Sequence, residues 1–177
     1  EFVTGADIGK DPEWSKERLA RDFDATVLCC GATKGRDLPI DNREAKGVHM
    51  AMDFLTANTS HQLDHDFDGT NPEELNATGK DVIVIGGGDT GTDCVGTSLR
   101  QKCKSVIQLE IMPMPPMERA PDNPWPEWPK VYTLDYGQVE AQAVKGEEPR
   151  KYLVMAKRFI KDDDGNVSGI EVVDITW

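Results

Sequence analysis

The contrast between apolar and polar segments is sharpest in the middle of the chain. The segment Asp81 to Ile85, apolar at every position after Asp81, is typical of a buried strand. It is followed at once by a glycine-rich segment, then by residues 92–101, which suit a helix, and then by a second predicted strand from Ser105 to Glu110. Strand, glycine turn, helix and strand form a βαβ unit, so we expect parallel strands with a helix packed on them.

Other patterned segments predict further elements. Residues 12–21 and 50–58 favour short helices, and the apolar run 24–33, closed by Gly31, predicts a buried strand that ends in a tight turn. Two alternating runs, 152–160 and 170–175, lie around an acidic turn and predict a β-hairpin. Together these elements predict an α/β fold with a central parallel sheet, flanking helices and an antiparallel hairpin.

Two stretches predict loops. Residues 60–79 combine acids with Gly69, Asn71 and Pro72, a composition that favours a solvated surface loop. Seven of the eleven prolines lie between Pro113 and Pro129, where no helix or central strand can persist. The Met and Trp residues beside these prolines predict a loop packed on its own protein rather than a ligand for an SH3-type domain.

Composition and charge narrow the function classes. The 177 residues carry 20 basic and 32 acidic side chains, a net charge of −12, which argues against nucleic acid or an anionic membrane as a partner. No run of about 18 apolar residues or signal peptide is present, so a soluble, unsecreted protein is expected. Because the chain does not begin with Met, we expect a piece of a longer protein.

The cysteines do not have the spacing of a metal site. Cys29, Cys30, Cys94 and Cys103 include no Cys-x-x-Cys pair and no His at zinc-like spacing. We expect packed, reduced thiols and no metal, which fits a reducing compartment.

The pattern Gly86-x-Gly88-x-x-Gly91 carries the chemistry, because it lies between a predicted strand and a predicted helix. In a dinucleotide-binding unit the first glycine makes a tight turn, the second lets the backbone approach a diphosphate, and the third allows close packing of helix and strand. The helix would offer free N–H groups to the diphosphate, and we expect Asp89 to cap this helix with its side chain turned aside. The pattern therefore predicts a Rossmann-like dinucleotide-binding domain.

Glu110 ends the next strand, where an acidic side chain can accept hydrogen bonds from both hydroxyls of the adenosine ribose. A 2′-phosphate would meet like charge there, so NADH is preferred to NADPH. The alternative, that Glu110 is only a solvated strand end, stays open.

Hydride transfer between cofactors needs no acid, base or nucleophile from the protein, so no catalytic residue is named. Ser98, His49 and Asp53 lack the context of a nucleophile elbow.

Four segments resemble glutamate synthase: 24–33, 48–58, 84–94 and the Pro/Trp stretch 119–129. The likeness is to the pyridine-nucleotide domain of its small (beta) subunit, or to the matching C-terminal region of the fused NADH-dependent enzyme. The glycine loop is shared with many flavoenzymes of the FAD/NAD(P) disulfide-reductase type, whereas the Pro/Trp stretch is more particular to glutamate synthase.

This resemblance implies two parts: residues 1–35 as a remnant of the FAD-binding domain and residues 36–177 as the NAD(P)H-binding domain. Gly86, Gly87, Gly88, Asp89, Thr90 and Gly91 would hold the nicotinamide cofactor, and Cys30, Gly31, Ala32 and Thr33 match the place where the chain leaves the FAD domain near the flavin. NADH would reduce FAD, and electrons would pass through iron–sulfur clusters to FMN on the large subunit or region, where glutamine and 2-oxoglutarate yield glutamate. The piece alone should not make glutamate.

Alternative interpretations stay open. The chain could be the NAD(P)H domain of a related flavin and iron–sulfur dehydrogenase. It could also be a Rossmann-like docking module without a ligand, whose acidic loop and Pro/Trp segment bind other subunits. Among compartments, the cytoplasm is expected, or a plastid if the parent is a plant enzyme.

Overall fold

The computed structural model describes residues 2–32 and 34–177, and the chain divides into two compact units, Glu1–Gly35 and Arg36–Trp177. Each unit is described by itself. The assignment of these units to an FAD-binding and an NAD(P)H-binding domain stays a prediction.

The first unit contains one turn of 3₁₀ helix, η1 (Pro12–Trp14), and helix α1 (Lys16–Asp22). Asp11 caps η1 and Ser15 caps α1 by accepting hydrogen bonds from backbone N–H groups of the first turn. The predicted strand at 24–33 is wrong for its described part: residues 25–32 form no ladder, and Val27 and Leu28 are 82% and 75% exposed. An apolar run becomes a strand only where another strand pairs with it, and the described part of this unit contains none.

The cysteines separate into two exposed and two buried thiols. Cys29 and Cys30 are exposed, so the prediction that they are packed is wrong, whereas Cys94 and Cys103 are buried. Burial raises the pKa of Cys94 to about 11 and also raises the pKa of Cys103. Both buried thiols therefore stay protonated and unreactive near neutral pH.

This difference predicts how the native protein reacts with a thiol reagent such as dithionitrobenzoate at pH 8. Cys29 and Cys30 should react promptly, and Cys94 and Cys103 only after unfolding in guanidinium. The double variant Cys29→Ser, Cys30→Ser should lose the whole fast phase. Fast reaction of all four cysteines in the native wild type would contradict the burial of Cys94 and Cys103.

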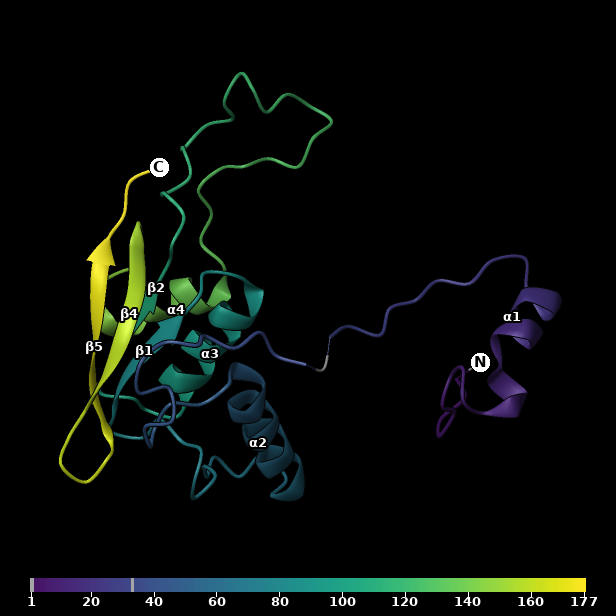
Figure 1. The fold of residues 1–177 in the computed structure, drawn as a ribbon, viewed down its shortest axis with the longest axis horizontal. Coiled ribbons are helices and arrows are strands. Elements are labelled where there is room, and N and C mark those ends of the chain that lie inside the picture. Colours follow the sequence, from purple (N-terminus) through teal and green to yellow (C-terminus); the bar gives the residue numbers. More distant parts are fainter. Residues whose placement is uncertain (1, 33) are drawn as a thin grey trace. The chain divides into compact units, whose positions relative to one another are not determined.

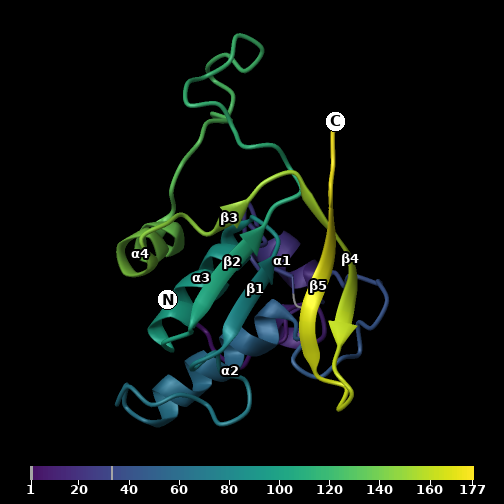
Figure 2. The same cartoon turned by 90° about the vertical axis from the view of Figure 1, so that its left-hand side faces the viewer.

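The predicted βαβ unit is confirmed. Strand β1 (Asp81–Ile85) pairs in parallel with β2 (Ser105–Leu109), and helix α3 (Asp89–Arg100) connects them. A two-residue strand, β3 (Arg150–Lys151), continues the parallel sheet in the order β1-β2-β3. Figure 2 shows these strands side by side, with α3 lying along one face of the sheet.

Alternation along the strands places the core between the sheet and α3. Val84 and Val106 point into the core, where they meet Val95 and Leu99 of the helix, and Val95 is fully buried. The intervening strand residues Ile83, Ile85 and Ile107 lie on the opposite face and are 38–43% exposed. The sheet therefore presents its buried face to α3, and the turn after β1 is held at the N-terminus of this helix.

Helix α4 (Tyr136–Lys145) was not predicted, and it packs against α3. Asp135 and Gln138 form a capping box at its N-terminus, and Gly146 ends it in the left-handed conformation. An Asp followed three residues later by Gln is the sequence signal that indicates this start.

Helix α2 (Ala51–Asp64) extends beyond the predicted helix into the stretch that was expected to be a loop. Its last turn is tied to the following chain, because His61 and Gln62 both hydrogen-bond Thr70, at 2.8 and 2.7 Å. The rest of that stretch, 65–79, contains no helix or strand, as expected.

The predicted hairpin is confirmed as β4 (Val154–Lys161) and β5 (Val167–Asp174).

A long loop connects β2 to α4 and extends away from the sheet (Figure 1). As the prolines predict, it has no helix or strand. The prediction that its Trp residues pack on the protein is wrong: Trp125 and Trp128 are 83% and 86% exposed. The loop is organised instead by Asn123, which is 3% exposed and whose side chain bonds Glu127, the Trp128 carbonyl and the Lys130 N–H.

Among the helices of the described residues, none combines the length and apolar character that crossing a membrane requires.

Candidate functional site

The glycine turn lies at the carboxyl end of β1. Gly86 continues the ladder by donating its N–H to the Leu109 carbonyl at 2.9 Å, and its φ of +119° then turns the chain out of the strand. A Cβ on Gly91 would overlap the Gly86 carbonyl oxygen and lie 2.7 Å from Nε2 of Gln108. The predicted tight turn at Gly86 and close approach at Gly91 are confirmed as features of the fold.

The N-terminus of α3 opens directly from this turn. Gly88 is its N-cap, no side chain makes a capping hydrogen bond, and the space where a Cβ of Gly88 would project is empty to at least 4 Å. The prediction that Asp89 caps the helix is wrong, because Asp89 is its first helical residue. Asp89 and Thr90 are both exposed. The first-turn N–H groups are therefore uncapped by side chains, and the helix dipole adds partial positive charge there.

The carboxylate of Glu110 lies against this turn. Glu110 follows β2 and is half-buried, and Oε1 accepts a hydrogen bond from the Met112 N–H at 2.8 Å. Its other oxygen, Oε2, occupies the space that a Cβ on Gly87 would need. The absence of a side chain at Gly87 thus allows an acid at the end of β2 to reach the glycine turn at the end of β1, a role for Gly87 that the motif alone did not indicate.

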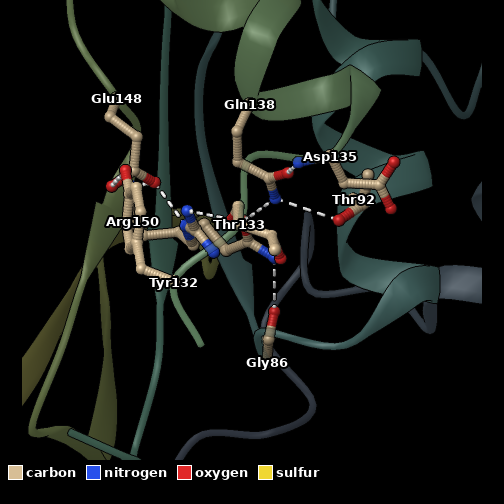
Figure 3. A network of polar contacts seen from close by, with 9 residues as sticks. Gly86, Thr92, Tyr132, Thr133, Asp135, Gln138, Glu148 and Arg150 are labelled. Atoms are coloured by element: carbon tan, nitrogen blue, oxygen red, sulfur yellow. Dashed lines mark hydrogen bonds and ion pairs between the residues drawn. The ribbon is translucent and has the colours of Figure 1, made fainter. Parts of the chain in front are cut away.

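Behind the turn lies a buried network of side-chain amides. Gln108 is fully buried on β2 and donates from Nε2 to the Gly86 carbonyl at 2.8 Å. Gln138, 1% exposed, reaches from α4 and donates from Nε2 to Oε1 of Gln108 and to Oγ1 of Thr92, both at 2.9 Å (Figure 3). Its Oε1 accepts the Asp135 N–H at 3.2 Å, which closes the capping box. The network joins β2, α3 and α4 to the turn.

A second polar cluster holds the chain that returns from the long loop. Arg150 on β3 is ion-paired with Glu148 and donates to the Thr133 carbonyl at 3.0 Å (Figure 3). Its guanidinium lies 5.1 Å from the ring centroid of Tyr132 and 5.4 Å from that of Tyr152. Burial raises the pKa of Tyr152 to about 12, so its hydroxyl stays protonated at neutral pH. Every charge of this cluster has a partner, which indicates a structural role.

The structure thus brings Glu110 to the glycine segment 86–91. The residues expected near the flavin are described within their own unit. Cys30, Gly31 and Ala32 belong to the first unit, where Cys30 lines a hollow of about 1080 Å³, and Thr33 lies outside the described residues. Ser98 is buried in α3 and donates to the Cys94 carbonyl at 2.7 Å.

Sequence reasoning missed Gln108 and Gln138. A polar residue at a core-facing position of an apolar strand is the signal that indicates Gln108, and the capping-box spacing indicates Gln138.

Within 2–32 and 34–177, no three His, Cys, Asp or Glu side chains gather in a way that could hold a metal ion.

Comparison with known proteins gives consistent relatives, although no family model matches the chain. The NADH glutamate synthase of Schizosaccharomyces pombe is 51% identical over all 177 residues, and that of Saccharomyces cerevisiae is 44% identical. The NADPH glutamate synthase small chain of Bacillus subtilis is 46% identical over 175 residues. The chain spans 8% of the length of each yeast protein and 35% of the bacterial small chain.

Proposed function

We propose that this chain, which is homologous over its whole length to one segment of the glutamate synthases, is the part of such an enzyme that binds NAD(P)H and presents it to FAD. The observation that carries the proposal is the uncapped N-terminus of α3 behind an open glycine turn, with the Glu110 carboxylate beside it.

The residues at this edge of the sheet fit a dinucleotide. The space beside Gly88 is empty, so a diphosphate could approach the backbone there. Among the described residues, no side chain caps the first N–H groups of α3, so these donors and the positive end of the helix dipole are available to an anion. Gly86, Gly87, Gly88, Asp89, Thr90 and Gly91 are the residues we assign to the nicotinamide cofactor.

Glu110 supports NADH over NADPH. Its carboxylate is fixed by the Met112 N–H and can accept hydrogen bonds from ribose hydroxyls, whereas a 2′-phosphate would be repelled. Among the ion pairs of the described residues, none involves Glu110, so its carboxylate is not committed to a salt bridge. Relatives named for NADH and for NADPH match this chain at similar identity, so the preference rests on Glu110.

The chemistry belongs to the cofactors: NADH supplies a hydride and FAD accepts it. The contribution of this chain is to bind and orient the nucleotide. We place Cys30, Gly31, Ala32 and Thr33 near the flavin, as the resemblance implies. The proposed partners are the FAD-binding domain and the glutamate synthase large subunit or region, with its iron–sulfur clusters and FMN, in the cytoplasm or a plastid.

The proposal is tested by calorimetric titration of the 177-residue chain with NADH and with NADPH at one fixed salt concentration. The wild type should bind NADH more tightly. Glu110→Ala should raise the Kd for NADH about tenfold, the equivalent of about 1.4 kcal/mol, and narrow the difference from NADPH, because the ribose loses its acceptor and the phosphate its repulsion.

The matched control is Glu118→Ala, which removes an exposed acid from the long loop and changes the net charge by the same amount as Glu110→Ala. This variant should leave both dissociation constants within about twofold of the wild type. Tighter binding of NADPH by the wild type would overturn the role of Glu110, and no binding of either nucleotide would remove the proposed function.

A docking module is the second candidate, and two observations favour it. Trp125 and Trp128 are held in an organised loop yet exposed over more than four-fifths of their surface. The exposed carboxylate of Asp89 also lies in the first turn of α3, where it competes with a diphosphate. This candidate takes first place if the titrations show no nucleotide binding.

A further inference from the structure

Gln108 and Gln138 are among the largest fully buried side chains of the described residues. A buried primary amide is costly unless its donors and acceptor are paired, and a purely structural core at this point would be served by Leu or Met. Both amides are paired, and three of their bonds form one series that leads from the start of α4 to the glycine turn, while a side branch from Gln138 reaches Thr92 on α3. This placement requires an explanation beyond packing.

The direction of the bonds fixes the orientation of both amides. Gln138 accepts the Asp135 N–H and donates to Gln108, so Gln108 receives this bond at Oε1 and presents its own N–H group to the Gly86 carbonyl. Each hydrogen bond in the series determines which end of the next amide must donate and which must accept. The last group in the series is the peptide between Gly86 and Gly87.

The orientation of that peptide decides what the turn offers to a ligand. In a planar trans peptide the carbonyl and the N–H point in opposite directions. With the Gly86 oxygen held inward by Gln108, the Gly87 N–H is directed to the outer side of the turn. A flipped peptide would place the carbonyl oxygen on that side and repel an anion. Gly86 has a φ of +119°, and glycine can adopt many backbone conformations besides this one. A contact from outside the turn is therefore needed to keep the Gly86–Gly87 peptide in one orientation.

We infer that Gln108 and Gln138 are positioning residues that hold the Gly86–Gly87 peptide in the orientation required for a nucleotide diphosphate. This inference rests on the proposed function, because it assigns a task within the same site. Neither glutamine contacts the nucleotide in this proposal, and both act through the backbone of the turn.

The test uses the 177-residue chain, ¹⁵N-labelled, with adenosine and ADP as probes in NMR titrations. Gln108→Met keeps the approximate volume and removes the amide. It should raise the Kd for ADP about tenfold and change the Kd for adenosine less than twofold, because only ADP uses the diphosphate-binding backbone. Gln138→Met, one bond further from the turn, should show the same pattern with a smaller factor, and it serves if Gln108→Met does not fold.

Gln101 provides a matched control. It is also 1% exposed, but it lies at the opposite end of α3, where it accepts the Ala77 N–H at 2.8 Å and donates to Asn58 at 2.7 Å. Gln101→Met should lower the Tm and leave the ratio of the ADP and adenosine constants unchanged. An ADP Kd in Gln108→Met equal to that of the wild type, or equal factors of loss for ADP and adenosine, would overturn the inference.

NMR spectra of the ligand-free protein distinguish failure of the inference from failure of the proposed function. Without any ligand, the amide signals of Gly86 and Gly87 should move in Gln108→Met and stay in place in Gln101→Met. If the wild type binds neither ADP nor adenosine, the proposed function fails, and these signals still decide whether Gln108 holds the turn. If the amide signals of Gly86 and Gly87 do not move in Gln108→Met, the inference that Gln108 holds this peptide is contradicted.

Discussion

Replacing Gly91 by alanine should destabilise the chain by about 3 kcal/mol, one of the largest losses we expect from a single methyl group. A Cβ at this position would overlap the Gly86 carbonyl oxygen and lie 2.7 Å from Nε2 of Gln108. Neither group can move freely, since one is backbone and the other is held in the buried amide network. The loss should be measured as the free energy of unfolding in urea, followed by far-UV circular dichroism.

Helix propensity alone would make Gly91→Ala stabilising, so a net loss of stability would be clear evidence of the steric overlap. Alanine in a helix interior is about 1 kcal/mol more favourable than glycine, so any net loss must come from the overlap. The control is Gly169→Ala in β5, where the nearest atom to the new Cβ would be 3.7 Å away, an ordinary contact. A Gly91→Ala protein as stable as Gly169→Ala would contradict the close approach of α3 to the turn.

Replacing Gly88 by alanine should have the opposite profile: a nearly unchanged fold and a large loss of binding. The backbone of Gly88, with φ −79° and ψ −178°, is extended and open to any residue, and a Cβ there would meet nothing within 4 Å. The methyl group would instead occupy the space through which a diphosphate approaches. We expect the Kd for NADH to rise at least about tenfold while the free energy of unfolding changes by about 1 kcal/mol or less, the usual cost of alanine at an N-cap.

Calorimetric titration with NADH and urea unfolding of the same Gly88→Ala preparation would measure both quantities. Glu118→Ala, far along the chain in the exposed loop, again serves as the control for nucleotide affinity. An unchanged affinity for NADH in Gly88→Ala would exclude this residue from the site, and a large loss of stability would show that the space beside Gly88 is not open.

The βαβ unit could be predicted because its signals are local. The apolar run of β1, the glycine segment and the second apolar run each fix their own conformation, and their order leaves parallel pairing as the natural solution. The predicted strand at 24–33 shows the limit of the same reasoning. Its apolar run is as clear as that of β1, but a strand exists only by pairing, and the described residues of the first unit supply no partner.

Other elements depended on contacts that leave little trace in a pattern. β3 has only two residues, Arg150 and Lys151, too few for any alternation, and it exists because β2 offers an edge. The last turn of α2 runs into an acidic, loop-like composition and is held there by hydrogen bonds to Thr70. The exposure of Trp125 and Trp128 is a further case, since apolar side chains in a loop normally predict packing.

By itself, the sequence determined the position of the turn, the helix that follows it and the acid at the end of β2, because each depends on residues close together in the chain. Only the tertiary structure decided that the Glu110 carboxylate lies over Gly87, and that Gln138 reaches Gln108, 30 residues away, and Gln108 reaches Gly86, 22 residues away. The physical reason is that a side-chain hydrogen bond forms wherever packing places donor and acceptor within about 3 Å, and that distance is set by how α3, α4 and the sheet meet.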